Sequence, residues 1–375
     1  MGVTSRQIPA FDGIRGVAIF WVVLHNATSM PLAPSGRWLH LFPLLTSRGW
    51  IGVQLFFALS GFLITKSLLE TQGQPGYFRN FYARRALRIV PLYYTVLVLL
   101  LLVLPGLGAH VPYRLDHQAP LWLFTANWTR SFPYGFGHFW SLAVEEQFYL
   151  LWPLVVFRSA PRRLLTACLW IALAALVVRC VLAACGTDPG VLYGNTACRM
   201  DALALGGAGA CLLRIPQVQD AMRTRQAAIS AAALLVFLAG IPFTRGYDIG
   251  RLSGETLGYT LLALSTAAFV SWVALPGLPA RNPIVSLLVW GPLRSCGKYS
   301  YGIYVFHNLL HILVGVPWLT VRFGKQLPVP VAMVYVIAVL LVSCALAFCS
   351  YHLLEKHFLR LKRFFEPRVA RAGVS

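Results

Sequence analysis

One helical segment combines an imidazole, a hydroxyl and a carboxylate at spacings that could support proton transfer. His138, Ser141 and Glu145 follow one another at i, i+3 and i+7, and these positions share one face of an α-helix. Glu146 points about 100° away from that face. Such a face can exchange a proton with a bound substrate, or it can be a polar clamp between helices. The sequence leaves both interpretations open.

A second pair of polar residues lies in the apolar segment 11 to 30. Arg15 and His25 would be separated by a rise of about 15 Å on a helix. His25 is a candidate general base because a neutral imidazole accepts protons near neutral pH; a packing histidine is the alternative. Arg15 is either a functional cation or an anchor that pairs with Asp12 one turn earlier.

An arginine cluster, Arg84-Arg85-Ala86-Leu87-Arg88, follows the second apolar segment. Arg85 and Arg88 lie one helical turn apart. Arginine binds phosphate oxygens through paired hydrogen bonds, so the cluster could hold a phosphate-bearing ligand. Positive charge at the cytoplasmic edge of a membrane explains it equally well.

Two further motifs are predicted to serve packing. Residues 206 to 209, Gly-Gly-Ala-Gly, predict a close approach of two helices. Arg199 and Asp201, just before them, are either polar contacts at the outer face or an ion pair that settles the helix end.

A polar stripe, for which we favour packing over metal binding, consists of Ser300, Tyr304, His307 and His311. The eight cysteines have no metal-ligand spacing, so no metal is expected.

The composition predicts that these residues are held in a lipid bilayer. Of the 375 residues, 58% are hydrophobic and 12% are charged, against about 25% charged in soluble domains. The mean hydropathy of +0.66 excludes a soluble globular protein and a disordered chain. The net charge of +20 comes from residues between apolar runs, so we expect no nucleic-acid partner.

Ten segments approach the roughly 20 apolar residues that a membrane-spanning helix needs. They are residues 11–30, 49–69, 89–105, 138–157, 164–184, 198–213, 227–244, 255–274, 299–316 and 329–350. We therefore predict an all-α, polytopic bundle of about ten transmembrane helices, with residues 106 to 137 forming an outer loop that contains a re-entrant or interfacial piece.

The distribution of basic residues orients this bundle. With both termini cytoplasmic, 21 of the 32 Lys and Arg residues lie on the inner side and ten on the outer side, as the positive-inside rule requires. The outer ten include Arg179 and Arg199. Residues 71 to 88 are then cytoplasmic and residues 31 to 48 are outside. We expect one transmembrane domain over residues 1–355 and a short basic cytoplasmic tail over 356–375, with no cleaved signal peptide.

Five motifs together resemble the acyltransferase 3 family of integral membrane O-acyltransferases. In chain order they are Phe11-Asp12-Gly13-Ile14-Arg15-Gly16 leading to His25, Phe56-Phe57-Ala58-Leu59-Ser60-Gly61-Phe62-Leu63, the arginine cluster continued as Ile89-Val90-Pro91, Trp140-Ser141-Leu142-Ala143-Val144-Glu145-Glu146-Gln147-Phe148-Tyr149-Leu150, and Ser300-Tyr301-Gly302-Ile303-Tyr304. The match extends over nearly the whole chain.

The resemblance implies a ten-helix enzyme that transfers an acyl group, commonly acetyl, from acyl-CoA to a hydroxyl of a carbohydrate or related acceptor, such as exopolysaccharide or lipopolysaccharide. It implies catalytic roles for His25, Ser141 and Glu145, and acyl-CoA contacts for Arg15, Arg85 and Arg88. Further candidates are Asp12, Ser60 and His138. It also implies a multi-pass protein of the bacterial cytoplasmic (inner) membrane that holds no tightly bound cofactor and uses acyl-CoA (acetyl-CoA) as co-substrate.

The chain departs from the family pattern in two places. Nine residues separate Arg15 and His25 where the family usually has ten, which rotates His25 by about 100° on an ideal helix. The final helix reads Glu355-Lys356-His357 where the family usually has Glu-x-Pro.

Acyl transfer to an alcohol needs a base for the hydroxyl proton and donors for the oxyanion. We expect direct transfer with His25 as the base, and an acyl-His or acyl-Ser intermediate as the minority alternative. A transporter or flippase with a relay through His25, His138 and Glu145 is the rival function, because intramembrane polar residues are expected there too.

Overall fold

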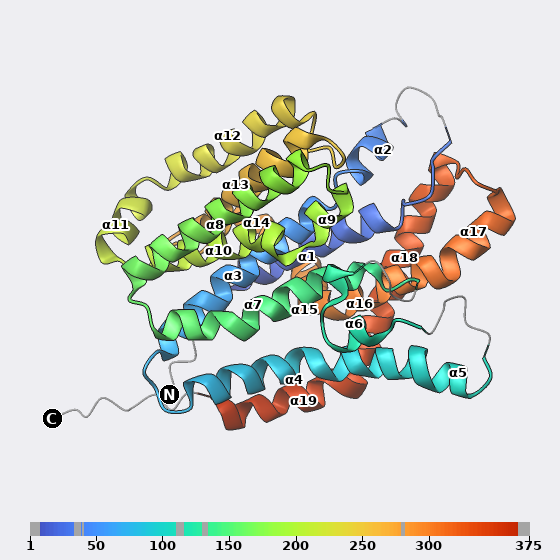
Figure 1. Ribbon diagram of the computed structural model, residues 1–375, viewed down its shortest axis with the longest axis horizontal. Coiled ribbons are helices and arrows are strands. Elements are labelled where there is room, and N and C mark those ends of the chain that lie inside the picture. Colours follow the sequence, from blue (N-terminus) through green and yellow to red (C-terminus); the bar gives the residue numbers. More distant parts are fainter. Residues whose placement is uncertain are drawn as a thin grey trace.

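The computed structural model describes residues 8–33, 39, 41–109, 116–129, 134–278 and 282–366. Over these ranges the chain is helical, without a strand and with one isolated β-bridge between Leu32 and Leu327. The long helices run side by side along the longest axis of the molecule (Figure 1). The all-α bundle expected from the sequence is confirmed. The predicted outer segment 31–48 and the basic tail lie partly outside the described residues.

The elements follow one another with short connections. The first half contains α1 (Pro9–Asn26), α2 (Leu41–Thr46), α3 (Ile51–Thr71), α4 (Tyr77–Val98), η1 (Leu99–Val103), α5 (Leu104–Gly106), α6 (Ala119–Trp122), η2 (Ala126–Trp128), η3 (Gly137–Phe139), α7 (Trp140–Phe157) and α8 (Pro161–Ala184). The second half contains α9 (Pro189–Gly194), α10 (Thr196–Leu212), α11 (Pro216–Thr224), α12 (Gln226–Thr244), η4 (Gly254–Gly258), α13 (Tyr259–Val273), α14 (Pro283–Leu288), α15 (Gly291–Lys298), α16 (Ser300–Leu310), η5 (His311–Gly315), α17 (Val316–Phe323), α18 (Val329–Ser350), η6 (Tyr351–Glu355), α19 (Lys356–Arg360) and η7 (Leu361–Phe365).

Seven helical stretches of the described chain are long and apolar enough to cross a membrane. They are Leu41–Thr71, Tyr77–Gly106, Pro161–Ala184, Gln226–Thr244, Gly254–Val273, Ser300–Phe323 and Val329–Phe365. The remaining expected spans correspond to α1, α7 and α10, which all pack against α3 and carry the polar residues singled out above. The count of ten crossings stays a prediction.

The outer helices expose apolar side chains, as a bilayer requires. On α8, Trp170 and Val181 are more than half exposed, and on α18 Val334 and Leu341 are too. Exposed apolar surface of this extent would be a liability in water. The chain is therefore an integral, multi-pass membrane protein.

Two helices extend beyond their predicted bounds. The span expected at residue 89 begins at Tyr77 and continues through Pro91, so the arginine cluster lies on the first turns of α4. Proline is tolerated inside membrane helices because neighbouring groups satisfy the freed backbone. The last helix continues past Ser350 to Phe365 and packs against α4, so the expected tail begins as packed helix.

The glycine motif brings α3 and α10 together, as predicted. A side chain at Gly206 would collide with the carbonyl oxygen of Ala58 on α3, and one at Gly61 would collide with the carbonyl oxygen of Leu203 on α10. Each helix therefore presents a glycine to the other's backbone. Such small residues allow the closest approach of membrane helices.

Two residues counted as outer-side charges lie inside the bundle instead. Arg179 and Arg199 are fully buried. Arg179 forms an ion pair with Asp201 at 2.7 Å, so the alternative of an Arg199–Asp201 pair was wrong. Charge counting could not reveal this, because it assigns a cation to the nearest membrane surface and cannot see a carboxylate on another helix.

Candidate functional site

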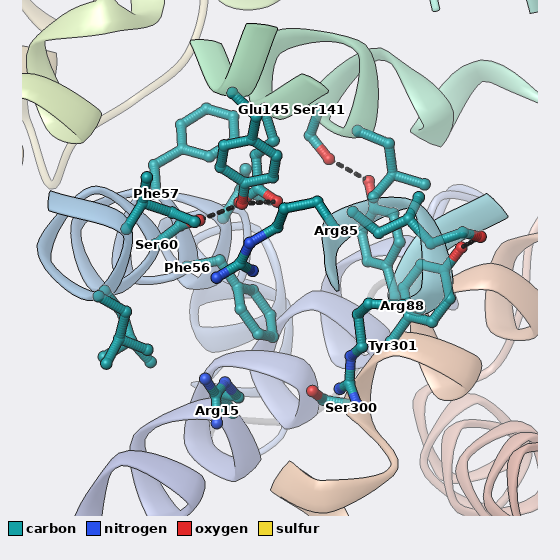
Figure 2. Close-up of a pocket in the computed structure, with 18 residues that line it drawn as sticks. Arg15, Phe56, Phe57, Ser60, Arg85, Arg88, Ser141, Glu145, Ser300 and Tyr301 are labelled. Atoms are coloured by element: carbon teal, nitrogen blue, oxygen red, sulfur yellow. Dashed lines mark hydrogen bonds between the residues drawn. The ribbon is translucent and has the colours of Figure 1, made fainter. Parts of the chain in front are cut away.

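A central cavity of about 170 Å³ lies between α1, α3, α4, α7 and α16 (Figure 2). It brings together six of the residues predicted for the site: Arg15, Ser60, Arg85, Arg88, Ser141 and Glu145. These come from four helices that are distant in the sequence. The arginine side chains face the two polar groups of α7 across the cavity. The resemblance implied that these motifs contribute to one site, and residues from each of the first four line this cavity.

Glu145 belongs to a hydrogen-bonded chain that ends on α3. The Tyr149 hydroxyl donates to Glu145 Oε2 at 3.0 Å, and Ser60 Oγ contacts the same hydroxyl. Because that hydroxyl has one proton and gives it to Glu145, Ser60 must be the donor to Tyr149. The Arg85 guanidinium lies 5.4 Å from the centre of the Tyr149 ring. A carboxylate, two hydroxyls and a cation thus form one polar cluster in the membrane interior.

Ser141 has a partner from the fifth motif. Its hydroxyl lies 2.5 Å from the hydroxyl of Tyr304 on α16, and the Tyr304 hydroxyl donates to the backbone carbonyl of His138. Ser141 is then the donor to Tyr304. The predicted α7 face is thereby held against α16, with Ser141 and Glu145 on the same cavity.

A basic vestibule adjoins the central cavity. This cavity of about 760 Å³ shares Arg15, Leu63, Arg85 and Arg88 with the central one. Further cations line it, from α3, α4, α15 and η7: Lys66, Arg84, Arg294, Lys298 and Lys362. Asp12 and Glu70 are its acidic residues. The vestibule therefore offers a strongly positive entrance suited to an anion with several negative charges.

Arg15 marks the boundary between the vestibule and the central cavity. Its Nη1 contacts Asp12 Oδ1 at 2.6 Å, one turn earlier on α1, so the predicted pairing is confirmed. Both side chains are about a third exposed, and Arg15 lines both cavities. The ion pair leaves the guanidinium at the passage between them.

His25 lies on a separate cavity toward the other end of α1. This outer cavity, of about 220 Å³, shares Val53 and Tyr304 with the central one. His25 Nδ1 donates to the carbonyl oxygen of Thr46 at 2.9 Å. The lone pair of the neutral ring is therefore on Nε2, which is the arrangement a general base needs. His25 also lines a more open pocket of the same end, beside Ser29 and Ser47.

The structure does not bring His25 and Glu145 into one site. Glu145 lines the central cavity and His25 the outer one, so Glu145 does not orient the His25 ring. The sequence could not decide this, because both residues lie on faces directed into the bundle and their depths differ.

His138 and the α16 histidines are engaged in hydrogen bonds. His138 Nε2 donates to the Val305 carbonyl at 3.3 Å, and its Nδ1 accepts from the Asn308 amide at 3.1 Å. His307 donates from Nδ1 to the Tyr304 carbonyl at 2.7 Å and accepts from Asn26 at 2.9 Å. Both ring nitrogens of each histidine are occupied. This agrees with the packing role favoured for His307, and it leaves His138, a candidate for the site, without a free ring nitrogen. No cluster of metal-ligating residues occurs among the described residues.

Sequence reasoning missed some of the lining residues. Tyr149 lay inside a quoted motif without an assigned role, although its spacing of one turn from Glu145 was an available signal. Tyr304 was assigned only to a packing stripe. Lys66, Lys298 and Lys362 resembled ordinary positive-inside charges. Their convergence depends on the packing of distant helices, which no local pattern records.

Comparison with known proteins agrees with this arrangement. The family model of an acyltransferase domain, acyltransferase 3, matches residues 8–348. YrhL of Bacillus subtilis is 28% identical, aligned over 94% of this chain and 55% of the relative. The peptidoglycan O-acetyltransferase OatA of Listeria monocytogenes is 27% identical over 81% of this chain and 49% of the relative. The O-acetyltransferase OatA of Staphylococcus aureus is 26% identical over 94% and 57%.

The chain spans about half the length of these curated relatives. No solved structure matches it significantly. The family model, however, extends over most of the chain and includes all five motifs that surround the central and outer cavities. The chain therefore belongs to the acyltransferase 3 family of membrane proteins.

Proposed function

We propose that the protein transfers an acetyl group from acyl-CoA to a hydroxyl of a carbohydrate. The observation that carries the proposal is the series of three cavities along the bundle. The basic vestibule shares residues with the central cavity, and the central cavity shares Val53 and Tyr304 with the His25 cavity. A long donor can enter at one end while the acceptor meets it near the other.

The basic vestibule suits the phosphate-bearing end of CoA. Arg85 and Arg88 lie one turn apart on α4 and border both the vestibule and the central cavity. Arginine can grip phosphate oxygens through paired hydrogen bonds. The pantetheine arm would then extend into the central cavity and bring the thioester toward Tyr304.

His25 supplies the base on the acceptor side. The acceptor hydroxyl gives its proton to Nε2 of His25 as its oxygen attacks the thioester carbonyl. The resulting oxyanion collapses, the carbon–sulfur bond breaks, and CoA leaves as the thiolate, which takes up a proton. We favour this direct transfer over an acyl-enzyme.

The relatives support a carbohydrate acceptor. All three are named as O-acetyltransferases; OatA of Listeria monocytogenes is named for peptidoglycan, and so, provisionally, is YrhL. We place the protein in the bacterial cytoplasmic membrane, where cytoplasmic acyl-CoA reaches one face and cell-surface glycans the other. Exopolysaccharide and lipopolysaccharide also carry sugar hydroxyl groups and are the alternative acceptors.

The test measures CoA thiol release by the full-length protein in lipid nanodiscs. Acetyl-CoA plus peptidoglycan glycan fragments should release CoA and label the glycan in equal amounts. A His25→Ala control should release far less. In sealed proteoliposomes, proton or solute flux without CoA release would contradict the proposal and favour the transporter.

A further inference from the structure

Arg199, on α10, is a buried cation that the reaction described above does not use. Its side chain is fully buried. Nη2 donates to Gln54 Oε1 at 2.7 Å, whereas Nε and Nη1 have no hydrogen-bond partner among the described residues. An unpaired charge in this position is costly, so its retention calls for a compensating environment.

The neighbouring ion pair does not compensate it. Asp201 is held by Arg179 Nη2 at 2.7 Å, and Thr260 Oγ1 donates to the same carboxylate at 3.3 Å. No carboxylate of the described chain forms an ion pair with Arg199. The positive charge of Arg199 therefore stays unneutralised inside the bundle.

Aromatic rings surround the Arg199 guanidinium. Its central carbon lies 4.4 Å from the ring centre of Tyr259, 5.2 Å from that of Tyr193 and 5.7 Å from that of Trp140. Phe57 and Trp50 follow at 5.9 and 6.0 Å. Ring faces attract a desolvated guanidinium electrostatically. The cation thus fixes the positions of these rings.

Three of these rings form a wall of the outer cavity. Trp50, Trp140 and Tyr193 line the space that also contains His25. Asn26 and Asn308 line it as well, and their amide nitrogens already contact His307 and His138. Their amide oxygens remain as hydrogen-bond acceptors. Flat aromatic walls with a few fixed polar groups are typical of small-molecule sites.

We propose that the outer cavity is the acceptor subsite for one sugar ring, and that Arg199 is the positioning residue for its aromatic wall. A pyranose has apolar C–H faces and a rim of hydroxyl groups, which match the rings and the amide oxygens respectively. A hydroxyl of that sugar then meets Nε2 of His25. This inference rests on the proposed function and assigns its acceptor to a specific place.

The first test changes the wall without changing the base. Tyr193→Leu removes one ring from a side chain that is half-buried on the short helix α9. Loss of this aromatic contact should raise the KM for glycan fragments about tenfold, the equivalent of about 1.4 kcal/mol. The KM for acetyl-CoA should stay unchanged, and Tyr193→Phe should behave as the wild type.

The matched control is Tyr247→Leu. Tyr247 belongs to the same aromatic cluster as Trp50 and Tyr259 but does not line the outer cavity. The Tyr247→Leu variant should have a lower melting temperature than the wild type and an unchanged KM for glycan fragments. An equal rise of the glycan KM in Tyr193→Leu and Tyr247→Leu would overturn the subsite.

The second test addresses Arg199. Arg199→Met removes the charge from among the surrounding aromatic rings and should raise the KM for glycan fragments at least tenfold. Arg199→Lys keeps a cation at this position and should raise that KM less. Combined with Tyr193→Leu, Arg199→Met should add little, because both changes disturb one wall. An unchanged glycan KM, or an equal rise in the acetyl-CoA KM, would overturn the positioning role.

A binding measurement separates this inference from the proposed reaction. Titration of the wild type and Tyr193→Leu with peptidoglycan glycan fragments in nanodiscs, without acetyl-CoA, should show binding to the wild type that weakens about tenfold in the variant. If the wild type releases no CoA but this difference persists, the reaction is wrong and the subsite is supported. Absence of glycan binding to the wild type would overturn the subsite.

Discussion

At the scale of single residues, the polar groups of the site differ in which of their donors and acceptors are already in hydrogen bonds. The Tyr304 hydroxyl gives its proton to the His138 carbonyl, and His138 uses both ring nitrogens. His25 differs, because its contact with Thr46 engages Nδ1. The proposed base, His25, therefore differs from the neighbouring histidines in its hydrogen bonds as well as in its position.

His25→Ala should lower kcat by a factor of about 10² to 10⁴, the usual contribution of a general base. The KM for acetyl-CoA should change little, because His25 lies on the outer cavity, away from the vestibule. Steady-state kinetics with detergent-solubilised enzyme measure both. His357→Ala, on the exposed part of α19, is the control. Near wild-type turnover in His25→Ala would mean that another residue is the general base.

Arg85 and Arg88 should act on the donor and not on the acceptor. Charged hydrogen bonds contribute about 1.5–3 kcal/mol each, so replacing both by Ala should raise the KM for acetyl-CoA by about 10² or more. Replacement by Lys should rescue only in part, because Lys cannot form the paired hydrogen bonds. The glycan KM should be unaffected. An unchanged KM for acetyl-CoA in a folded double variant would mean that these arginines only orient the protein in the membrane.

At the scale of elements, the crossing of α3 and α10 places Ser60, which is on the central cavity, one residue before the tightest contact at Gly61. The same crossing places Arg199 on the Gln54 side of α3. A backbone contact this close determines the positions of both helices. The site's geometry therefore depends on glycines that touch no substrate.

Gly206→Val should destabilise the protein by about 1–3 kcal/mol through overpacking, because the new side chain would collide with the Ala58 carbonyl. Gly106→Ala is the matched control, since nothing lies within 4 Å of a side chain added there. Thermal unfolding in detergent should show a lower melting temperature for Gly206→Val alone. Equal melting temperatures would mean that the crossing can separate without cost.

Local pattern predicted much of these elements and part of the site. The apolar runs predicted several long helices, among them α3, α8 and α12, to within a few residues, because a membrane helix must satisfy its own backbone. The start of α4 at Tyr77 was not predicted, since its first turns carry Arg79, Arg84 and Arg85 and resemble a loop. The separation of His25 from Glu145, and the burial of Arg199, depend on helix packing, which leaves no local periodic signal.

At the scale of the whole molecule, the three cavities give the protein two functionally different ends. The vestibule is lined by Ile8 at the start of α1 and by Lys362 near the end of the described chain, so the two ends of the described chain meet at the donor entrance. In Figure 1, α5 and α17 lie at the opposite end of the bundle from α11. From the positive-inside distribution we expect the vestibule to face the cytoplasm.

This arrangement predicts one-sided use of the donor. In sealed inside-out membrane vesicles, added acetyl-CoA should be consumed, because the vestibule faces the medium. In right-side-out vesicles from the same cells, consumption should be close to zero until a detergent opens them, since a charged nucleotide does not cross a bilayer. Cysteines at Pro75 and Lys325 provide the topology control: an impermeant thiol reagent should label Pro75→Cys only in inside-out vesicles and Lys325→Cys only in right-side-out ones. Consumption in intact right-side-out vesicles with the labelling pattern preserved would place the donor entrance at the outer end, where His25 lies, and would reverse the direction of transfer.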